Sequence, residues 1–192
     1  ILDKYSPEVN FFFKGRAIIT MDYDEIPNLP SPPANTPMVE VPGDLGKLVR
    51  KVADLMDGIT NYPWGCGQMG RTDSAFSCLG KMTAISNGPT SLGVCASLGH
   101  DICLIKNLED RFPVAAEILK KENVFLHIDE VDEYSHQKDP FKKIEVLERT
   151  DELMKQYFSD AKRIVYFADH GTSCVTGEHI ITDVPVWTTF DC

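Results

Sequence analysis

Short apolar runs alternate with amphipathic segments from Lys81 to the end of the chain, and this rhythm constrains the fold more than any other feature. Apolar, mostly branched or aromatic runs flanked by Gly, Pro, Asn or Asp predict strands at residues 82–86, 101–105, 124–128, 163–168 and 184–188. Apolar positions three and four residues apart predict helices that start near Ser91 or span Leu108–Lys121 and Pro140–Phe158. We therefore predict an α/β domain with a mainly parallel, buried sheet and helices on both faces.

The predicted helix over Pro140–Phe158 has the clearest boundary signals. Asp139 can cap its amino terminus, and Pro140 stands at the first helical position, where a missing N–H costs nothing. The apolar spacing predicts that one face of this helix packs on the sheet through Phe141, Ile144, Leu147, Met154 and Phe158.

The first 62 residues have a different pattern. The apolar stretch Val9–Tyr23, interrupted by Lys14-Gly15-Arg16, predicts a hairpin or a bent strand. Six prolines between Pro27 and Pro42 exclude a helix or a central strand, so we expect an extended crossing there. A helix that Asp44 can cap then runs to Gly58. We predict a domain boundary in the next Gly/Pro loop, which gives domains of residues 1–62 and 63–192.

Net charge and hydropathy exclude two classes of partner. The formal charge is -10 and no Lys/Arg-rich run is present, which argues against binding to nucleic acid. No apolar run is long enough to span a bilayer, and the opening residues lack the pattern of a signal peptide, so we expect a cytoplasmic protein without membrane contact. The six cysteines form no C-x-x-C pair, and we interpret them as reduced thiols.

Side chains that can bind a metal lie next to three of the predicted strands. Asp132 and His136 come after strand 124–128 in a predicted loop, Asp169 and His170 come after strand 163–168, and His179 precedes strand 184–188. Each group by itself is typical of a solvated ion pair, but sites in parallel sheets lie at the carboxyl ends of strands, where these groups can converge. Mixed carboxylate and imidazole ligands favour Mn or Zn over Ca.

In order and spacing, D-x-x-x-H at Asp132, D-H at Asp169 and H-x-x-x-D-V-P at His179 resemble the metal-binding signature of the phosphoglycerate mutase and alkaline phosphatase superfamily. The W-G-C-G-Q segment from Trp64 is similar to the W-G-x-G segment of archaeal-type, cofactor-independent phosphoglycerate mutases, and residues 81–99 resemble the next segment of those enzymes. The resemblance covers about residues 64–192. It implies the carboxyl-terminal portion of an alkaline-phosphatase-like core, preceded in residues 1–62 by the tail of an inserted α+β domain.

The resemblance also implies a reaction and its cofactors. Asp132, His136 and His179 would hold one divalent metal, Mn or Zn, while Asp169 and His170 would hold part of a second. The implied reaction interconverts 3-phosphoglycerate and 2-phosphoglycerate, small phosphorylated substrates, through a phosphoserine. The family also uses an Asp from an amino-terminal strand and a nucleophilic Ser, and no segment here matches either. We therefore expect an amino-terminal segment of the same protein as a partner.

Two alternatives stay open. One is another hydrolase or phosphomutase of the superfamily, such as a phosphodiesterase, a phosphopentomutase or a phosphonate hydrolase, and the other is a non-catalytic metal-binding relative. Four further residues are weaker candidates for ligand orientation, phosphate contact or proton transfer, and for each a packed or solvated role competes: Arg71, Lys81, His127 and Glu133. We expect His100 at the surface or in a cap.

Overall fold

The computed structural model describes residues 8–11, 17–22, 41, 43–55, 63–67 and 80–190, and the chain divides into two compact units, 1–70 and 71–192. In the first unit, strands β1 (Glu8–Phe11) and β2 (Ala17–Thr20) pair antiparallel, which confirms the predicted hairpin. Helix α2 spans Gly43–Leu55, with Asp44 in its first turn. Apart from Val41, the predicted Pro-rich crossing lies outside the described residues. The assignment of residues 1–62 to an inserted domain stays a prediction.

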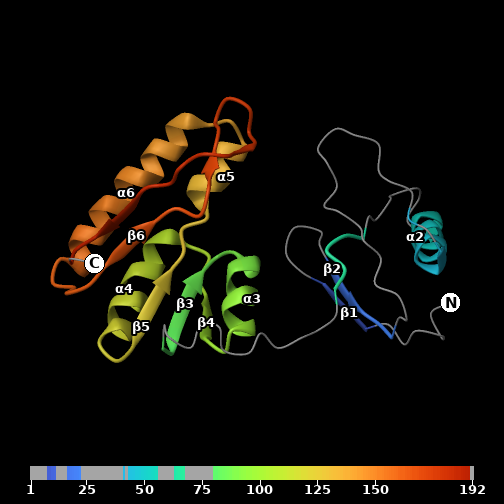
Figure 1. The fold of residues 1–192 in the computed structure, drawn as a ribbon, viewed down its shortest axis with the longest axis horizontal. Helices are drawn as coiled ribbons and strands as arrows, with labels where there is room; N and C mark the ends of the chain where they lie inside the picture. The colour runs from blue at the N-terminus through green and yellow to red at the C-terminus, as the bar shows by residue number, and fades with distance from the viewer. Residues whose placement is uncertain are drawn as a thin grey trace. The chain divides into compact units, whose positions relative to one another are not determined.

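The second unit carries the predicted alternation of strands and helices (Figure 1). Its elements in chain order are β3 (Met82–Ser86), α3 (Pro89–Ser97), β4 (Asp101–Leu104), α4 (Leu108–Leu119), β5 (Asn123–Leu126), α5 (Glu130–His136), α6 (Pro140–Phe158), β6 (Val165–Phe167), β7 (Gly171–Thr172), β8 (His179–Ile180) and β9 (Val186–Thr188).

Strands β3, β4 and β5 form a parallel sheet in the order β4-β3-β5, so β3 is central. Successive residues of a strand point to opposite faces, and both faces of β3 are covered. Ala84 packs with Leu92 of α3 on one face, and Ile85 packs with Phe112 of α4 on the other. This arrangement confirms the predicted parallel sheet with helices on both faces.

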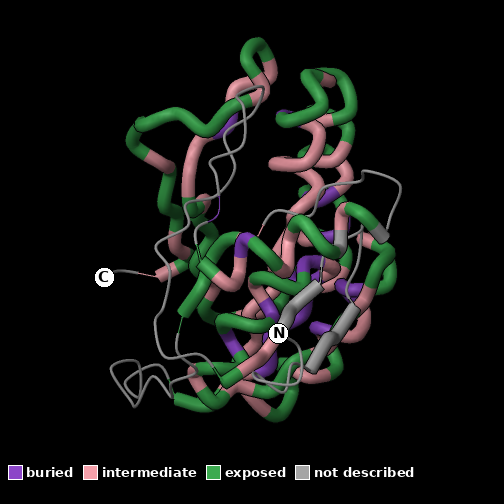
Figure 2. The backbone as a smooth tube through the Cα atoms, turned by 90° about the vertical axis from the view of Figure 1, so that its right-hand side faces the viewer, coloured by how far each residue is buried: buried purple, intermediate pink, exposed green. Residues whose placement is uncertain are grey.

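Most of the described residues that are buried lie in β3, α3, α4 and α6, and Figure 2 draws the buried parts of the backbone in purple. The larger core cluster joins β3, α4 and α6 through residues that are at most 9% exposed: Ile85, Phe112, Ala115, Leu153 and Phe158. Among the residues that the structure describes, no helix is both long and apolar enough to cross a membrane.

Helix α6 begins and ends where predicted, and the Asp139 carboxylate caps it by accepting from Lys142 N at 3.0 Å. Its predicted inner face is right only toward the carboxyl end. Phe158 is buried and Met154 packs against the core, but Phe141 is 82% exposed, and Ile144 and Leu147 are exposed as well. Leu153, outside the predicted face, is also buried. The reason is the position of α4. An ion pair between Glu109, in the first turn of α4, and Arg149 places the start of α4 beside the middle of α6. Helix α4 therefore covers only the carboxyl-terminal half of α6.

The expectation that the last two strands join the parallel sheet is wrong for the described residues. Strands β6 and β9 pair with each other, antiparallel, with Tyr166 opposite Trp187. A chain reversal between them, which the short β7–β8 pair makes, returns β9 alongside β6 without a crossover helix. Both strands are largely exposed, with Trp187 at 59%.

Candidate metal centre

The segment that carries Asp132 and His136 is a helix, α5, so the prediction of a loop there is wrong. Residues four apart on a helix lie on the same face, so the helix brings the two side chains together. The His136 Nε2 atom lies 3.1 Å from Asp132 Oδ2. Ser135, fully buried, marks the inner side of α5, and its hydroxyl donates to the Val131 carbonyl one turn earlier in the same helix at 2.8 Å.

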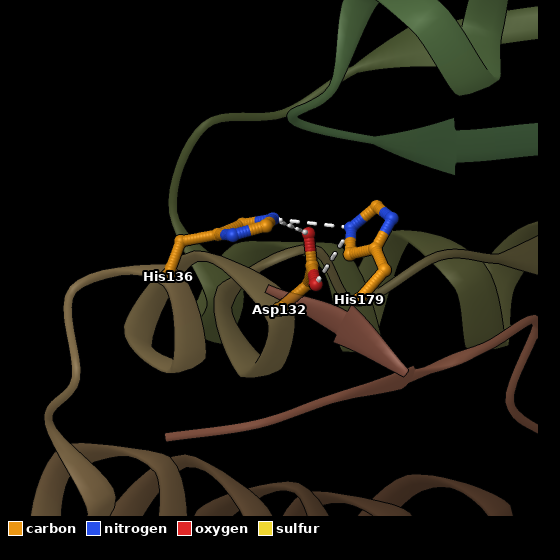
Figure 3. A group of neighbouring side chains, drawn as sticks. All are labelled: Asp132, His136 and His179. Atoms are coloured by element: carbon orange, nitrogen blue, oxygen red, sulfur yellow. Dashed lines mark hydrogen bonds and ion pairs between the residues drawn. The ribbon is translucent and has the colours of Figure 1, made fainter. Parts of the chain in front are cut away.

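The third member of the group comes from a hairpin 43 residues further along. Strand β7 pairs with β8, with Thr172 opposite His179. His179 Nε2 lies 3.2 Å from His136 Nε2 and 3.6 Å from Asp132 Oδ1. One potential ligand atom from each of Asp132, His136 and His179 therefore lies within 4.8 Å of the others, and Figure 3 shows the three side chains converging.

The hydrogen bond on the far side of the His136 ring fixes which nitrogen can bind a metal. His136 Nδ1 lies 2.8 Å from the Gly177 carbonyl, which can only accept, so Nδ1 carries the proton. In the neutral ring, Nε2 then presents its lone pair toward Asp132 and His179. Metal-binding histidines in proteins are usually oriented by such a second hydrogen bond.

Asp169 and His170 lie next to this group rather than inside it. The His170 ring lies against the His179 ring, tilted by 33° with centroids 3.9 Å apart, and His170 Nε2 lies 3.5 Å from Asp169 Oδ2. The other oxygen of Asp169 accepts from His170 N at 3.0 Å. The structure thus brings all five predicted ligands to one place, as a group of three and an adjoining pair.

Sequence reasoning missed Thr172, which links the two groups. Its hydroxyl donates to Asp132 Oδ1 at 2.5 Å and lies 3.2 Å from His170 Nδ1. The Lys143 ammonium donates to the Thr172 carbonyl at 3.1 Å and sets a positive charge beside the strand. The sequence signal that could have identified Thr172 was its position two residues after His170, directly after the Asp169-His170-Gly171 motif.

Two of the weaker candidates, His127 and Lys81, make contacts outside the centre. His127 Nδ1 lies 3.0 Å from the Ser86 hydroxyl and its ring stacks on Phe125, as expected of a packed strand histidine. Lys81 forms an exposed ion pair with Asp101, and Arg71 lies outside the described residues. His100 precedes β4, at the amino end of the sheet.

Asp129, at the start of α5, has an altered acidity. Burial raises the pKa of its carboxyl above the ordinary value of 3.8, the nearby His127 opposes the shift, and the acidic neighbours Glu133, Asp132 and Glu130 add to it. An acidic group in this position increases the negative potential at the centre when it ionises. A cation is the kind of ligand that such a potential favours.

The donor set fits a divalent transition metal. Two imidazole nitrogens and one carboxylate are the ligands that Mn²⁺ and Zn²⁺ accept, and they leave coordination positions open for substrate or water. His136 Nε2 and His179 Nε2 face each other at 3.2 Å, a distance at which a protonated His179 Nε2 donates a hydrogen bond to His136 Nε2. A bound cation would take the place of that proton and bind both nitrogens.

Comparison with known proteins agrees with this geometry. Residues 106–191 match the sequence profile of the Metalloenzyme superfamily, a group of alkaline-phosphatase-like, metal-dependent enzymes of phosphoryl-transfer type. The fold is similar to that of the PH0037 protein from Pyrococcus horikoshii, with a TM-score of 0.60 and 23% identity over 74% of this chain. The match covers 42% of the PH0037 chain. No curated protein matches. The region that holds Asp132, His136, Asp169, His170 and His179 is therefore similar in sequence to the Metalloenzyme superfamily.

Proposed function

We propose that the protein is a metal-dependent phosphoryl-transfer enzyme whose first metal is held by Asp132, His136 and His179. The observation that carries the proposal is the approach of these three side chains from α5 and β8, with ligand atoms within 4.8 Å of one another. Asp169 and His170 would hold part of a second cation. A pair of metals in such a site supplies charge stabilisation to the attacking and leaving oxygens of a phosphoryl group.

The chain's own residues prepare the site for that chemistry. Gly177 and Thr172 each engage the Nδ1 edge of one histidine, which leaves the Nε2 edges of His136 and His170 for metal. The Lys143 ammonium donates to the Thr172 carbonyl and so places one positive charge beside β7. Exposure of Asp169, at 72% of its side chain, leaves that side of the group open to substrate.

Within this class, we propose the interconversion of 3-phosphoglycerate and 2-phosphoglycerate. Its support is the order D-x-x-x-H, D-H, H-x-x-x-D-V-P together with the W-G-C-G-Q segment at Trp64. A hydrolase or another phosphomutase of the superfamily would use the same metal ligands and is the second candidate. A panel of phosphate mono- and diesters, offered to the Mn-loaded protein together with the amino-terminal segment expected to carry the nucleophilic Ser, separates the two by product.

Metal content tests the site directly. We expect the wild-type chain to take up Mn²⁺ or Zn²⁺, and Asp132→Ala and His136→Ala each to lose the first ion, because each removes one of three protein ligands. Elemental analysis after gel filtration measures the metal-to-protein ratio. His100→Ala is the matched control, since His100 lies at the opposite end of the sheet and should keep the wild-type ratio. Equal ratios in all four proteins would contradict the proposal.

A further inference from the structure

The hydroxyl of Thr172 touches one ligand from each candidate metal group. It donates to Asp132 Oδ1 at 2.5 Å and lies 3.2 Å from His170 Nδ1, and the residue is only 9% exposed. These contacts reach across 40 residues of sequence to α5 and two residues back to the D-H turn. Neither the family match nor the fold assigns this residue a role.

The direction of each hydrogen bond is set by the chemistry of the partners. A carboxylate at Asp132 can only accept, so the single hydroxyl proton of Thr172 points to Oδ1. Toward His170 the hydroxyl oxygen must then act as the acceptor, which places the ring proton on Nδ1. In the neutral ring, His170 Nε2 is left with its lone pair, on the side that faces Asp169.

Strand β7 holds this hydroxyl in place by three backbone features. Thr172 pairs with His179 in the β7–β8 register, its carbonyl accepts from the Lys143 ammonium, and Gly171 before it leaves no room for a side chain. A Cβ at Gly171 would stand 2.7 Å from Thr182 Cγ2 and 2.9 Å from Ile180 Cγ1. The hydroxyl therefore stays where it meets both ligands.

We propose that Thr172 is a positioning residue that serves both metal sites, orienting the Asp132 carboxylate for one and setting the metal-binding tautomer of His170 for the other. This inference rests on the proposed function, since it concerns the same centre. It adds a residue whose hydroxyl, and not its size, determines metal affinity.

The first test is metal affinity, measured by calorimetric titration of the full chain with Mn²⁺ and then Zn²⁺. Thr172→Val should weaken binding about 10- to 100-fold, as loss of an outer-shell partner of a ligand generally does. Thr172→Ser keeps the hydroxyl and should bind nearly as well as the wild type. Thr182→Val is the control for the chemical change, because the Thr182 hydroxyl makes only a 3.4 Å bond to the Asp183 carbonyl. Equal affinity of Thr172→Val and the wild type would overturn the proposal.

The second test needs no metal, and its main result comes from the wild type. Nitrogen-15 chemical shifts of the histidine rings, recorded on the metal-free protein at a pH where the rings are neutral, report which nitrogen of His170 carries the proton. We expect Nδ1–H, with a shift toward Nε2–H in Thr172→Val and no change in Thr172→Ser. An Nε2–H tautomer in the wild type would overturn the proposal.

The two tests separate this inference from the proposed function. Failure of the wild type to bind either metal would refute the proposed function, and the ring tautomer would still decide whether Thr172 orients His170. Metal binding by the wild type that Thr172→Val leaves unchanged would refute only the role of Thr172.

Discussion

Arg111 is a fully buried cation whose N–H groups bond to three carbonyls just after β4 and β5 and to one carboxylate of α5. Its Nε donates to the Ile105 carbonyl, Nη2 to the Lys106 carbonyl and Nη1 to the His127 carbonyl. Both terminal nitrogens also bind Glu130, at the start of α5. The guanidinium therefore ties the ends of β4 and β5 to the helix that carries Asp132.

Removing this guanidinium should be costly. Arg111→Met leaves the Glu130 carboxylate, only 15% exposed, without its partner, and a broken buried ion pair typically costs about 3–5 kcal/mol of unfolding free energy. Urea unfolding monitored by circular dichroism measures the loss. Arg149→Met, which breaks the exposed pair with Glu109, is the matched control and should cost much less. Similar losses in the two variants would contradict this account.

The raised pKa of Asp129 predicts a pH-dependent stability. Since burial raises the folded-state pKa above 3.8, the proton held by the folded state contributes stability at low pH that is lost as pH rises through the folded pKa. Asp129→Asn removes this titration. The unfolding free energy of the variant should therefore rise relative to that of the wild type as the pH goes from acidic to neutral. Urea unfolding of the metal-free proteins across that range is the measurement.

Glu109 gives the opposite trend and serves as the control for Asp129. Its hydrogen bond with Arg149 lowers the pKa of the Glu109 carboxyl, so the stability it contributes is present above the unfolded-state pKa and is lost as pH falls. Glu109→Gln should therefore lose stability relative to the wild type toward neutral pH. The same sign for both variants would show that the pKa directions are wrong.

At the scale of elements, the centre depends on how the β7–β8 hairpin meets α5. The Gly177 carbonyl in the hairpin loop accepts from His136, and Ser173 N in turn bonds the Glu178 carbonyl to close the loop. Gly177 has a φ of +75°, and a Cβ there would lie 3.0 Å from the His136 carbonyl oxygen. Close approach and backbone conformation both require glycine.

Gly177→Ala should therefore move the hairpin away from α5 and weaken metal binding. Gly99 is a matched control, because it also has a positive φ, +84°, but a Cβ there would meet nothing within 4 Å. Both alanine variants carry a backbone cost of about 1 kcal/mol, while only Gly177→Ala should lower Mn²⁺ affinity. Calorimetric titration decides it, and equal affinities of the two variants would argue against the contact.

At the scale of the whole molecule, the side chains of the centre come from three separate segments of the second unit, residues 132–136, 169–172 and 179, so metal binding and folding of this unit should be coupled. Mn²⁺ at one hundred times its dissociation constant should raise the unfolding free energy by about 2.7 kcal/mol. Thermal unfolding with Mn²⁺ and with EDTA measures the difference. Asp132→Ala should show none, and a metal-induced shift of equal size in that variant would place the ion elsewhere.

The sequence alone determined the features that depend on near neighbours. Strand β3, helix α6 and the Asp139 cap result from short-range periodicity and capping chemistry, and the five proposed ligands stand out because each motif is contained in a few residues. The prediction failed where packing competes with local pattern. Helix α5 is too short and acidic to be recognised by period, and it forms as one side of a packed pair with α6.

Only the tertiary structure decided which of these local motifs meet. The 3.2 Å approach of His136 and His179 joins residues 43 apart, and the antiparallel pairing of β6 with β9 results from the chain reversal between them. The proposed role of Thr172 likewise could not be predicted from the sequence, because it depends on hydroxyl contacts with Asp132 and His170 that only the fold brings about. Backbone propensities act over a few residues, whereas strand direction, ligand convergence and hydrogen-bond direction are set by contacts distant along the chain.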